Sequence, residues 1–180
     1  MAVVALYDAN VLYPNTLRDV LIRVAMAGLV RARWTDAILD EVFEHLLANR
    51  PDLDPERLDR TRTLMNKAIR DVLVEGYEPR MARLKLPDPD DRHVLAAAIQ
   101  AKASVIVTSN TKDFPNSVLD QYGIAAQRPD AFLLALCENH APTIRAVVND
   151  IARTWDDPAE VVLTSLAASA PETAARLSSL

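Results

Sequence analysis

The stretch Val3-Val4-Ala5-Leu6-Tyr7-Asp8-Ala9-Asn10, near the N-terminus, decides the fold class. Five consecutive apolar residues are typical of a short strand that is buried on both faces, as strands of parallel sheets are. The carboxylate of Asp8 follows this run directly, at the carboxyl edge where open α/β folds bind their ligands. We therefore expect Asp8 and Asn10 to belong to a functional site.

The same order of residues recurs later in the chain. The apolar run Ser104–Val107 leads into the polar segment Thr108-Ser109-Asn110-Thr111-Lys112-Asp113. If the two strands are parallel neighbours, their carboxyl ends meet at one sheet edge and bring Asp8 close to Asn110 and Asp113. Taken alone, Asn110 and Asp113 also fit a turn, because Asn and Asp side chains bind their own backbone.

A third acidic group, Asp88-Pro89-Asp90-Asp91, precedes a helix that we expect over residues 91–102. A helix that begins at Asp91 places this carboxylate on the apolar face, where an uncompensated charge is costly. A second interpretation fits equally well, because Asp is common at helix N-caps and in first turns. Carboxylates that converge from separate elements favour a divalent cation and phosphate chemistry.

Hydrophobic periodicity predicts alternating strands and helices, and therefore a parallel sheet that is covered on both faces. Beyond His140 only helical patterns follow, separated by Pro142, Pro158 and Pro171. We expect an α/β domain over residues 1–139 and an α-helical extension over residues 140–180. The expected helices cover 16–27, 35–48, 54–70, 80–84, 91–102, 116–122 and 129–139, and the expected strands cover 2–7, 72–74, 104–107 and 124–127.

Composition limits the class of protein. The 180 residues suit one domain with a short appendage, and the net charge of −5 argues against a protein that coats nucleic acid. The single cysteine, Cys137, cannot form an internal disulfide. No apolar stretch approaches the ~20 residues of a membrane span, so we expect a cytoplasmic protein.

Basic residues gather in two parts of the sequence. Either group could bind phosphates, or it could be an ordinary solvated helix surface. The first group comprises Arg18, Arg23, Arg31 and Arg33, and the second comprises Arg57, Arg60, Arg62, Lys67, Arg70, Arg80, Arg83 and Lys85.

At this point the residues resemble a known family. The sequence Asp8-Ala9-Asn10, then Ile38-Leu39-Asp40-Glu41, then Asp91 before an alanine-rich helix, then Thr108–Phe114, is similar to a PIN domain. The likeness extends over roughly residues 2–135, and the residues are similar in particular to the VapC-type toxins of bacterial toxin–antitoxin pairs. It implies a three-layer α/β/α domain with an α-helical C-terminal extension.

The resemblance implies an endoribonuclease that depends on Mg²⁺ or Mn²⁺. On that pattern Asp8, Glu41, Asp91 and Asp113 are the catalytic and metal-binding acids, with Asn10, Asn110 and Thr108 as supporting polar groups. It also implies an RNA substrate, a homodimer and a small cognate antitoxin, with no membrane partner. Two assignments remain open, because Asp88 and Asp90 compete with Asp91, and Asp40 and Glu44 compete with Glu41.

Periodicity by itself places Glu41 in solvent and turns His93 toward a different helix face from Asp91. Two other functions remain as alternatives. One is a phosphatase with Asp8 as covalent nucleophile, although Asn10 stands where that chemistry needs a second Asp. The other is a non-catalytic interaction protein that retains the fold and binds a partner through its C-terminal helices.

Overall fold

The computed structural model describes residues 2–180 and contains one sheet of four parallel strands. The sheet order is β2-β1-β3-β4, so the N-terminal strand lies in the middle next to β3. All three strand pairs are parallel, which confirms the predicted α/β class. The strands are β1 (Val3–Tyr7), β2 (Val30–Arg33), β3 (Val105–Val107) and β4 (Ala125–Gln127).

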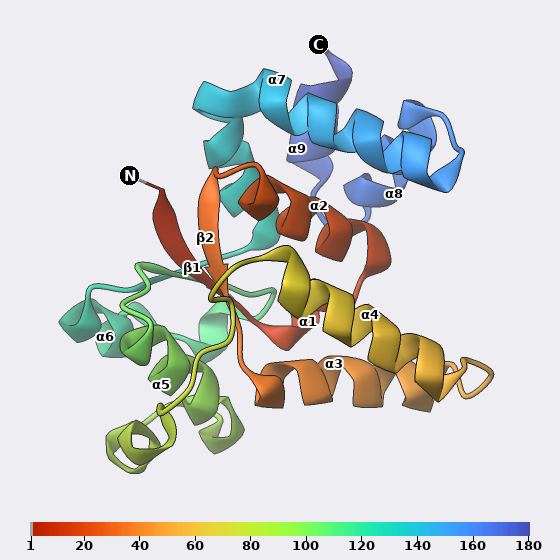
Figure 1. Cartoon of the computed structure of the whole chain (residues 1–180). Helices are drawn as coiled ribbons and strands as arrows, with labels where there is room; N and C mark the ends of the chain where they lie inside the picture. The colour runs from red at the N-terminus through yellow and green to blue at the C-terminus, as the bar shows by residue number, and fades with distance from the viewer. Residues whose placement is uncertain (1) are drawn as a thin grey trace.

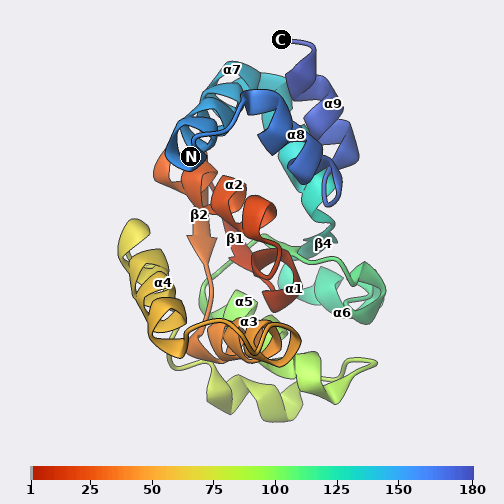
Figure 2. The ribbon, with the colours of Figure 1, turned by 90° about the vertical axis from the view of Figure 1, so that its right-hand side faces the viewer.

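Helices flank the sheet on both sides (Figures 1 and 2). In both views α2 and α7 to α9 gather toward one end of the molecule, whereas α3, α4 and α5 lie toward the other. The α-helices are α1 (Ala9–Leu12), α2 (Asn15–Met26), α3 (Asp36–Asn49), α4 (Pro55–Ala68), α5 (Arg92–Gln100), α6 (Asn116–Leu119), α7 (Pro129–Trp155), α8 (Ala159–Ala167) and α9 (Pro171–Ser178). Four 3₁₀ helices join them: η1 (Glu78–Arg83), η2 (Pro89–Asp91), η3 (Thr111–Asp113) and η4 (Asp120–Tyr122).

Several helix ends form where local sequence chemistry predicts them. Thr35 caps α3, since its hydroxyl accepts a hydrogen bond from the Ile38 amide at 3.0 Å. Asp54 caps α4 in the same way, with Pro55 at the first helical position. Gly28 follows α2 with a φ of 84°, a left-handed conformation that glycine adopts without steric cost.

The position of the second strand along the chain is the main difference between the structure and the sequence prediction. Residues 72–74 form no strand, and the edge position is occupied by β2, which the sequence analysis missed. Two arginines alternate with apolar residues in β2, so the segment lacks the continuous apolar run that marks β1. Residues 72–74 make only an isolated bridge with Trp34. The Trp34 backbone amide donates to the Val72 carbonyl, and the Trp34 carbonyl accepts from the Val74 amide.

Helix α7 spans the boundary that the sequence predicts at residue 139. The helix kinks at His140, whose φ of −133° is not helical. Pro142 explains the kink, because proline lacks an amide donor and clashes with the carbonyl four residues earlier. The buried core is continuous across this point, and Thr16 of α2 lies 2.6 Å from Ser165 of α8 between their hydroxyl oxygens. The division at residue 139 stays a prediction. No helix within residues 2–180 is long and apolar enough to cross a membrane.

Candidate active site

Asp8 lies at the carboxyl end of the central strand and is only 6% exposed. Its backbone amide donates to the Val107 carbonyl at 3.0 Å, which joins the ends of β1 and β3. Its carboxylate caps α1, because Oδ1 accepts from the Ala9 amide at 2.8 Å. Oδ2 accepts from the hydroxyl of Thr108, a fully buried residue, at 2.9 Å. A buried carboxylate with these donors is held in a fixed position.

The side-chain amide of Asn10 links the ends of β1 and β3 through hydrogen bonds from its nitrogen and to its oxygen. Its Nδ2 donates to Asp8 Oδ2 at 3.3 Å and to Thr108 Oγ1 at 3.1 Å. Its Oδ1 accepts from the Ser109 backbone amide at 2.9 Å. Thr108 Oγ1 in turn accepts from the Asn110 amide at 3.1 Å. The two polar segments that the sequence analysis paired are therefore hydrogen-bonded to each other.

Asp91 differs from Asp88 and Asp90, the other two candidates for the third acid, in its position relative to the cleft. Asp88 caps the 3₁₀ turn η2, where it accepts from the Asp90 amide at 2.9 Å, and both residues are exposed. Asp91 comes next, at the start of α5, and is half-buried with no capping hydrogen bond. Of these three aspartates only Asp91 lines the cleft that contains Asp8.

Glu41 reaches the same cleft from the middle of α3. Its side chain remains 45% exposed, but Oε1 accepts a hydrogen bond from His93 Nε2 at 2.8 Å. His93 is on α5, its side chain is 13% exposed, and its buried Nδ1 has no partner within residues 2–180. Periodicity alone separates His93 from Asp91, because no pattern in one sequence shows that α3 and α5 meet at these positions.

Asp113 and Asn110 occupy the loop after β3. Asp113 ends the 3₁₀ turn η3 and is half-buried, and its charge acts on Asp91. Asn110 is exposed and lines the cleft. Asp113 does not line the cleft itself, so the four predicted acids divide into three that surround one space and a fourth that lies close to it.

The electrostatics of the site follow from burial and like charge. Burial raises the pKa of Asp91, and the neighbouring carboxylates of Asp8, Asp88, Asp113 and Glu41 raise it further, to about 6. Burial also raises the pKa of Asp8, although the hydrogen bonds from Thr108 and Ala9 oppose this change. Crowded carboxylates of this kind are most stable beside a cation or a proton.

These side chains fit a hard cation that retains much of its water. Within residues 2–180 no three His, Cys, Asp or Glu side chains are arranged to hold one ion together. Mg²⁺ typically binds through one or two carboxylates and keeps several waters, so it needs no closed protein cage. Asp8 and Asp91 line one space and repel each other, so two carboxylates face the space in which such an ion would be held.

The cleft at this edge has a volume of about 320 Å³. It is lined by the polar and acidic groups of Asp8, Asn10, Glu41, Asp91 and Asn110, and also by Tyr13, Val42, His45 and Asn49. Glu41, His45 and Asn49 lie along one face of α3, because they follow one another at four-residue intervals.

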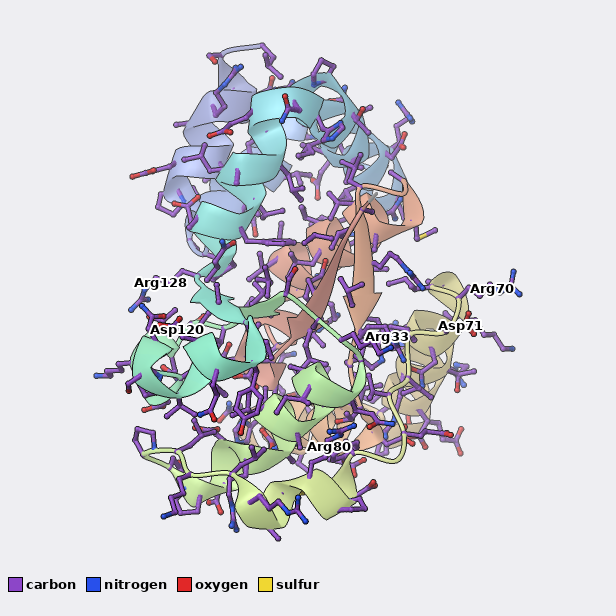
Figure 3. All side chains as sticks on the ribbon, turned by 90° about the vertical axis from the view of Figure 1, so that its left-hand side faces the viewer. Arg33, Arg70, Asp71, Arg80, Asp120 and Arg128 are labelled. Atoms are coloured by element: carbon purple, nitrogen blue, oxygen red, sulfur yellow. The ribbon has the colours of Figure 1, made fainter. Side chains whose placement is uncertain are left out.

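Several residues of the two basic groups have partners within the fold. Figure 3 shows Arg33, of the first group, and Arg70, of the second, on the same side of the view. Arg33 donates to the carbonyls of Val72 and Leu73, and Arg80 donates to the Gln100 side chain at 2.9 Å. Arg62 pairs with Asp36 and Asp40. Several of these cations therefore have structural partners.

Comparison with known families agrees with this arrangement. A family model described as "PIN domain" matches residues 4–112, more than half of the chain, and includes Asp8, Glu41 and Asp91. The chain belongs to the PIN domain family. The matched part of this PIN domain contains β1, β2, β3 and the α3 and α5 helices that carry the cleft.

One relative resembles part of this PIN domain. The protein named "Putative ribonuclease VapC50" from Mycobacterium tuberculosis (strain ATCC 25618 / H37Rv) is 44% identical over 68 residues. The alignment covers 38% of this chain and 40% of that relative, so the likeness is confined to a segment of each protein. No solved structure matches the chain.

Proposed function

We propose that this PIN domain is an endoribonuclease that depends on Mg²⁺ or Mn²⁺. The observation that carries the proposal is the convergence of Asp8, Glu41 and Asp91 on one cleft at the carboxyl edge of the sheet. The fold does not require three carboxylates from three separate elements to lie together. Their like charges repel and so raise the free energy of the folded state. A bound divalent cation would remove this repulsion and would explain why the three carboxylates converge.

A bound cation would lower the pKa of a coordinated water and offset the charge that develops on the phosphate. Asp8 and Asp91 would be its direct ligands, and Asp113 would contribute charge from the neighbouring loop. Thr108 and Asn10 donate to Asp8 Oδ2 and so fix the direction in which the remaining lone pairs point. Glu41 lies where it could accept a proton from water, with its orientation set by His93.

The proposal includes the partners that the resemblance implies. The substrate would be RNA, and the protein would be the toxin of a VapBC-type pair that acts in the cytoplasm as a homodimer. A small cognate antitoxin would block the cleft. Residues 1–139 would form the nuclease unit and residues 140–180 the helical extension.

The test is cleavage of a defined RNA by the purified full chain. We expect cleavage with Mg²⁺ or Mn²⁺, none with excess chelator, and recovery when the metal is restored. Internal rather than terminal cuts, read from end-labelled RNA, distinguish an endonuclease. Cleavage that persists undiminished in chelator would contradict metal dependence, and an intact RNA in every condition would favour the non-catalytic alternative.

A further inference from the structure

Besides the acidic residues, the cleft has a second region, formed by Tyr13, His45 and Asn49. Its side chains come from the end of α1 and from the face of α3 that carries Glu41. From Glu41 to Asn49 the helix advances by eight residues, or about 12 Å along its axis. Asn49 is therefore set apart from the carboxylates, and His45 lies between Glu41 and Asn49 along the helix.

The chemistry of this region differs from that of the acidic end. Of the described residues that line it, none is acidic and none is Lys or Arg, so it offers no permanently charged cation for a phosphate. It presents instead a phenol ring, an imidazole and a carboxamide. Single-stranded RNA is read by this combination, because unpaired bases stack on aromatic rings and hydrogen-bond to amide groups.

The polar groups of the region are already oriented. Asn49 Nδ2 donates to the Tyr13 hydroxyl oxygen at 2.9 Å across the gap between α3 and the end of α1. This contact leaves the Asn49 carbonyl oxygen as an acceptor and the Tyr13 hydroxyl hydrogen as a donor. Asn49 and His45 are exposed and Tyr13 is half-buried, so a ligand can reach all three. The whole cleft, about 320 Å³, is at the small end of the range for ligand sites, about 300–1,000 Å³.

We propose that Tyr13, His45 and Asn49 form a subsite for one unpaired nucleoside of the RNA, next to the phosphate that a cation bound at the carboxylates would hold. The base stacks on the Tyr13 or His45 ring, and Asn49 with the Tyr13 hydroxyl hydrogen-bonds to its edge. This inference rests on the proposed function, since it assumes that RNA is the ligand. It adds that the protein selects single-stranded RNA and favours particular bases at this position.

Binding of short homopolymeric RNAs separates this inference from catalysis. Fluorescence anisotropy in the inactive Asp8→Asn background measures Kd whether or not cleavage occurs. We expect Asn49→Ala and His45→Ala each to raise Kd, and Tyr13→Leu to raise it by at least about fivefold, as loss of a stacking contact of 1 kcal/mol or more predicts. Tyr13→Phe should retain stacking but lose part of the preference among bases.

Two matched controls lie outside the cleft. Tyr122→Leu and Asn139→Ala change the same residue types at exposed positions and should leave Kd unchanged. In the active protein the subsite variants should raise KM more than they lower kcat, and a duplex RNA should bind more weakly than the single strand. Equal Kd values for subsite variants and wild type would overturn the subsite. If wild type binds RNA through these residues but never cleaves it, the catalytic proposal fails while the subsite stands.

Discussion

His93 Nε2 lies 2.8 Å from Glu41 Oε1 and connects the middle of α3 to the first turn of α5. The Glu41 side chain is 45% exposed, so without this contact it would be free to rotate into solvent. Burial lowers the pKa of His93, but its hydrogen bond to Glu41 and the charges of Glu41, Asp8 and Asp91 outweigh that effect and raise it. The contact therefore places a carboxylate at the cleft and keeps it there.

Replacement of His93 by Ala should weaken the site without removing a direct metal ligand. Loss of a group that orients a site carboxylate typically costs about 10- to 100-fold in metal affinity or activity. We expect the Mn²⁺ dissociation constant, measured by calorimetry, to rise within that range. His93→Gln keeps an N–H donor and should recover part of the loss, whereas His140→Ala, at an exposed histidine on α7, should change nothing. Unaltered Mn²⁺ affinity in His93→Ala would show that the contact has no positioning role.

Asp91 makes the metal-free protein less stable as pH rises. Its folded-state pKa of about 6 is above the ordinary 3.8, so its contribution to stability is complete below about pH 4 and is lost as pH rises through 6. Because the residue is partly solvated, screening reduces the effect at pH 7 to about 1 kcal/mol. In chelator, Asp91→Asn should unfold at a higher temperature than wild type at pH 7 and at the same temperature at pH 4. A lower unfolding temperature for Asp91→Asn at pH 7 would disprove this account.

The hydroxyl of Thr108 should matter to stability as well as to the site. Thr108→Val keeps the side-chain shape but removes the donor to Asp8 Oδ2, which leaves a buried carboxylate with one fewer hydrogen bond. The expected loss in free energy of unfolding is about 1–3 kcal/mol, measured by urea denaturation. Thr108→Ser retains the hydroxyl and should lose less. Equal stability of the Val and wild-type proteins would mean that the hydrogen bond is not needed.

Metal binding should distinguish Asp91 from Asp88 and Asp90. Asp88→Asn preserves a capping side chain, and Asp90 is exposed, so both variants should bind Mn²⁺ within about twofold of wild type. Asp91→Asn should weaken binding by about 10-fold or more, because it removes a direct ligand. A larger loss of Mn²⁺ affinity in Asp88→Asn than in Asp91→Asn would reverse the assignment.

The sequence predicts the fold well where local signals are strong. The apolar run of β1, the Thr35 cap and the Asp54-Pro55 pair each specify their element within a few residues, and the structure confirms them. Strand β2 was missed because its exposed and half-buried positions hold arginine, so its apolar pattern is too short to be recognised. Trp34, which follows it, pairs with residues 72–74 through contacts that no local pattern reveals.

The site was only partly predictable for a similar reason. Asp8 and Asn110 follow strands, and their approach could be expected once parallel neighbours were assumed. The position of Glu41 depends on how α3 packs against α5, which is a tertiary relationship with no periodic signature. Helical periodicity therefore placed Glu41 in solvent, and only the resemblance included it in the site. The Glu41 side chain is 45% exposed, which agrees with its periodicity. It also lines the cleft that contains Asp8, next to His93.

RNA cleavage by Asp8→Asn, with Mn²⁺ present, tests the central claim most directly. This substitution removes one charge from the buried carboxylate at the centre of the site and retains an oxygen to accept from Thr108. The account predicts a folded protein, with an unfolding temperature equal to or above that of wild type in chelator, and a loss of cleavage of at least about 100-fold. Cleavage by folded Asp8→Asn at the wild-type rate would contradict the claim that this cleft is the nuclease site.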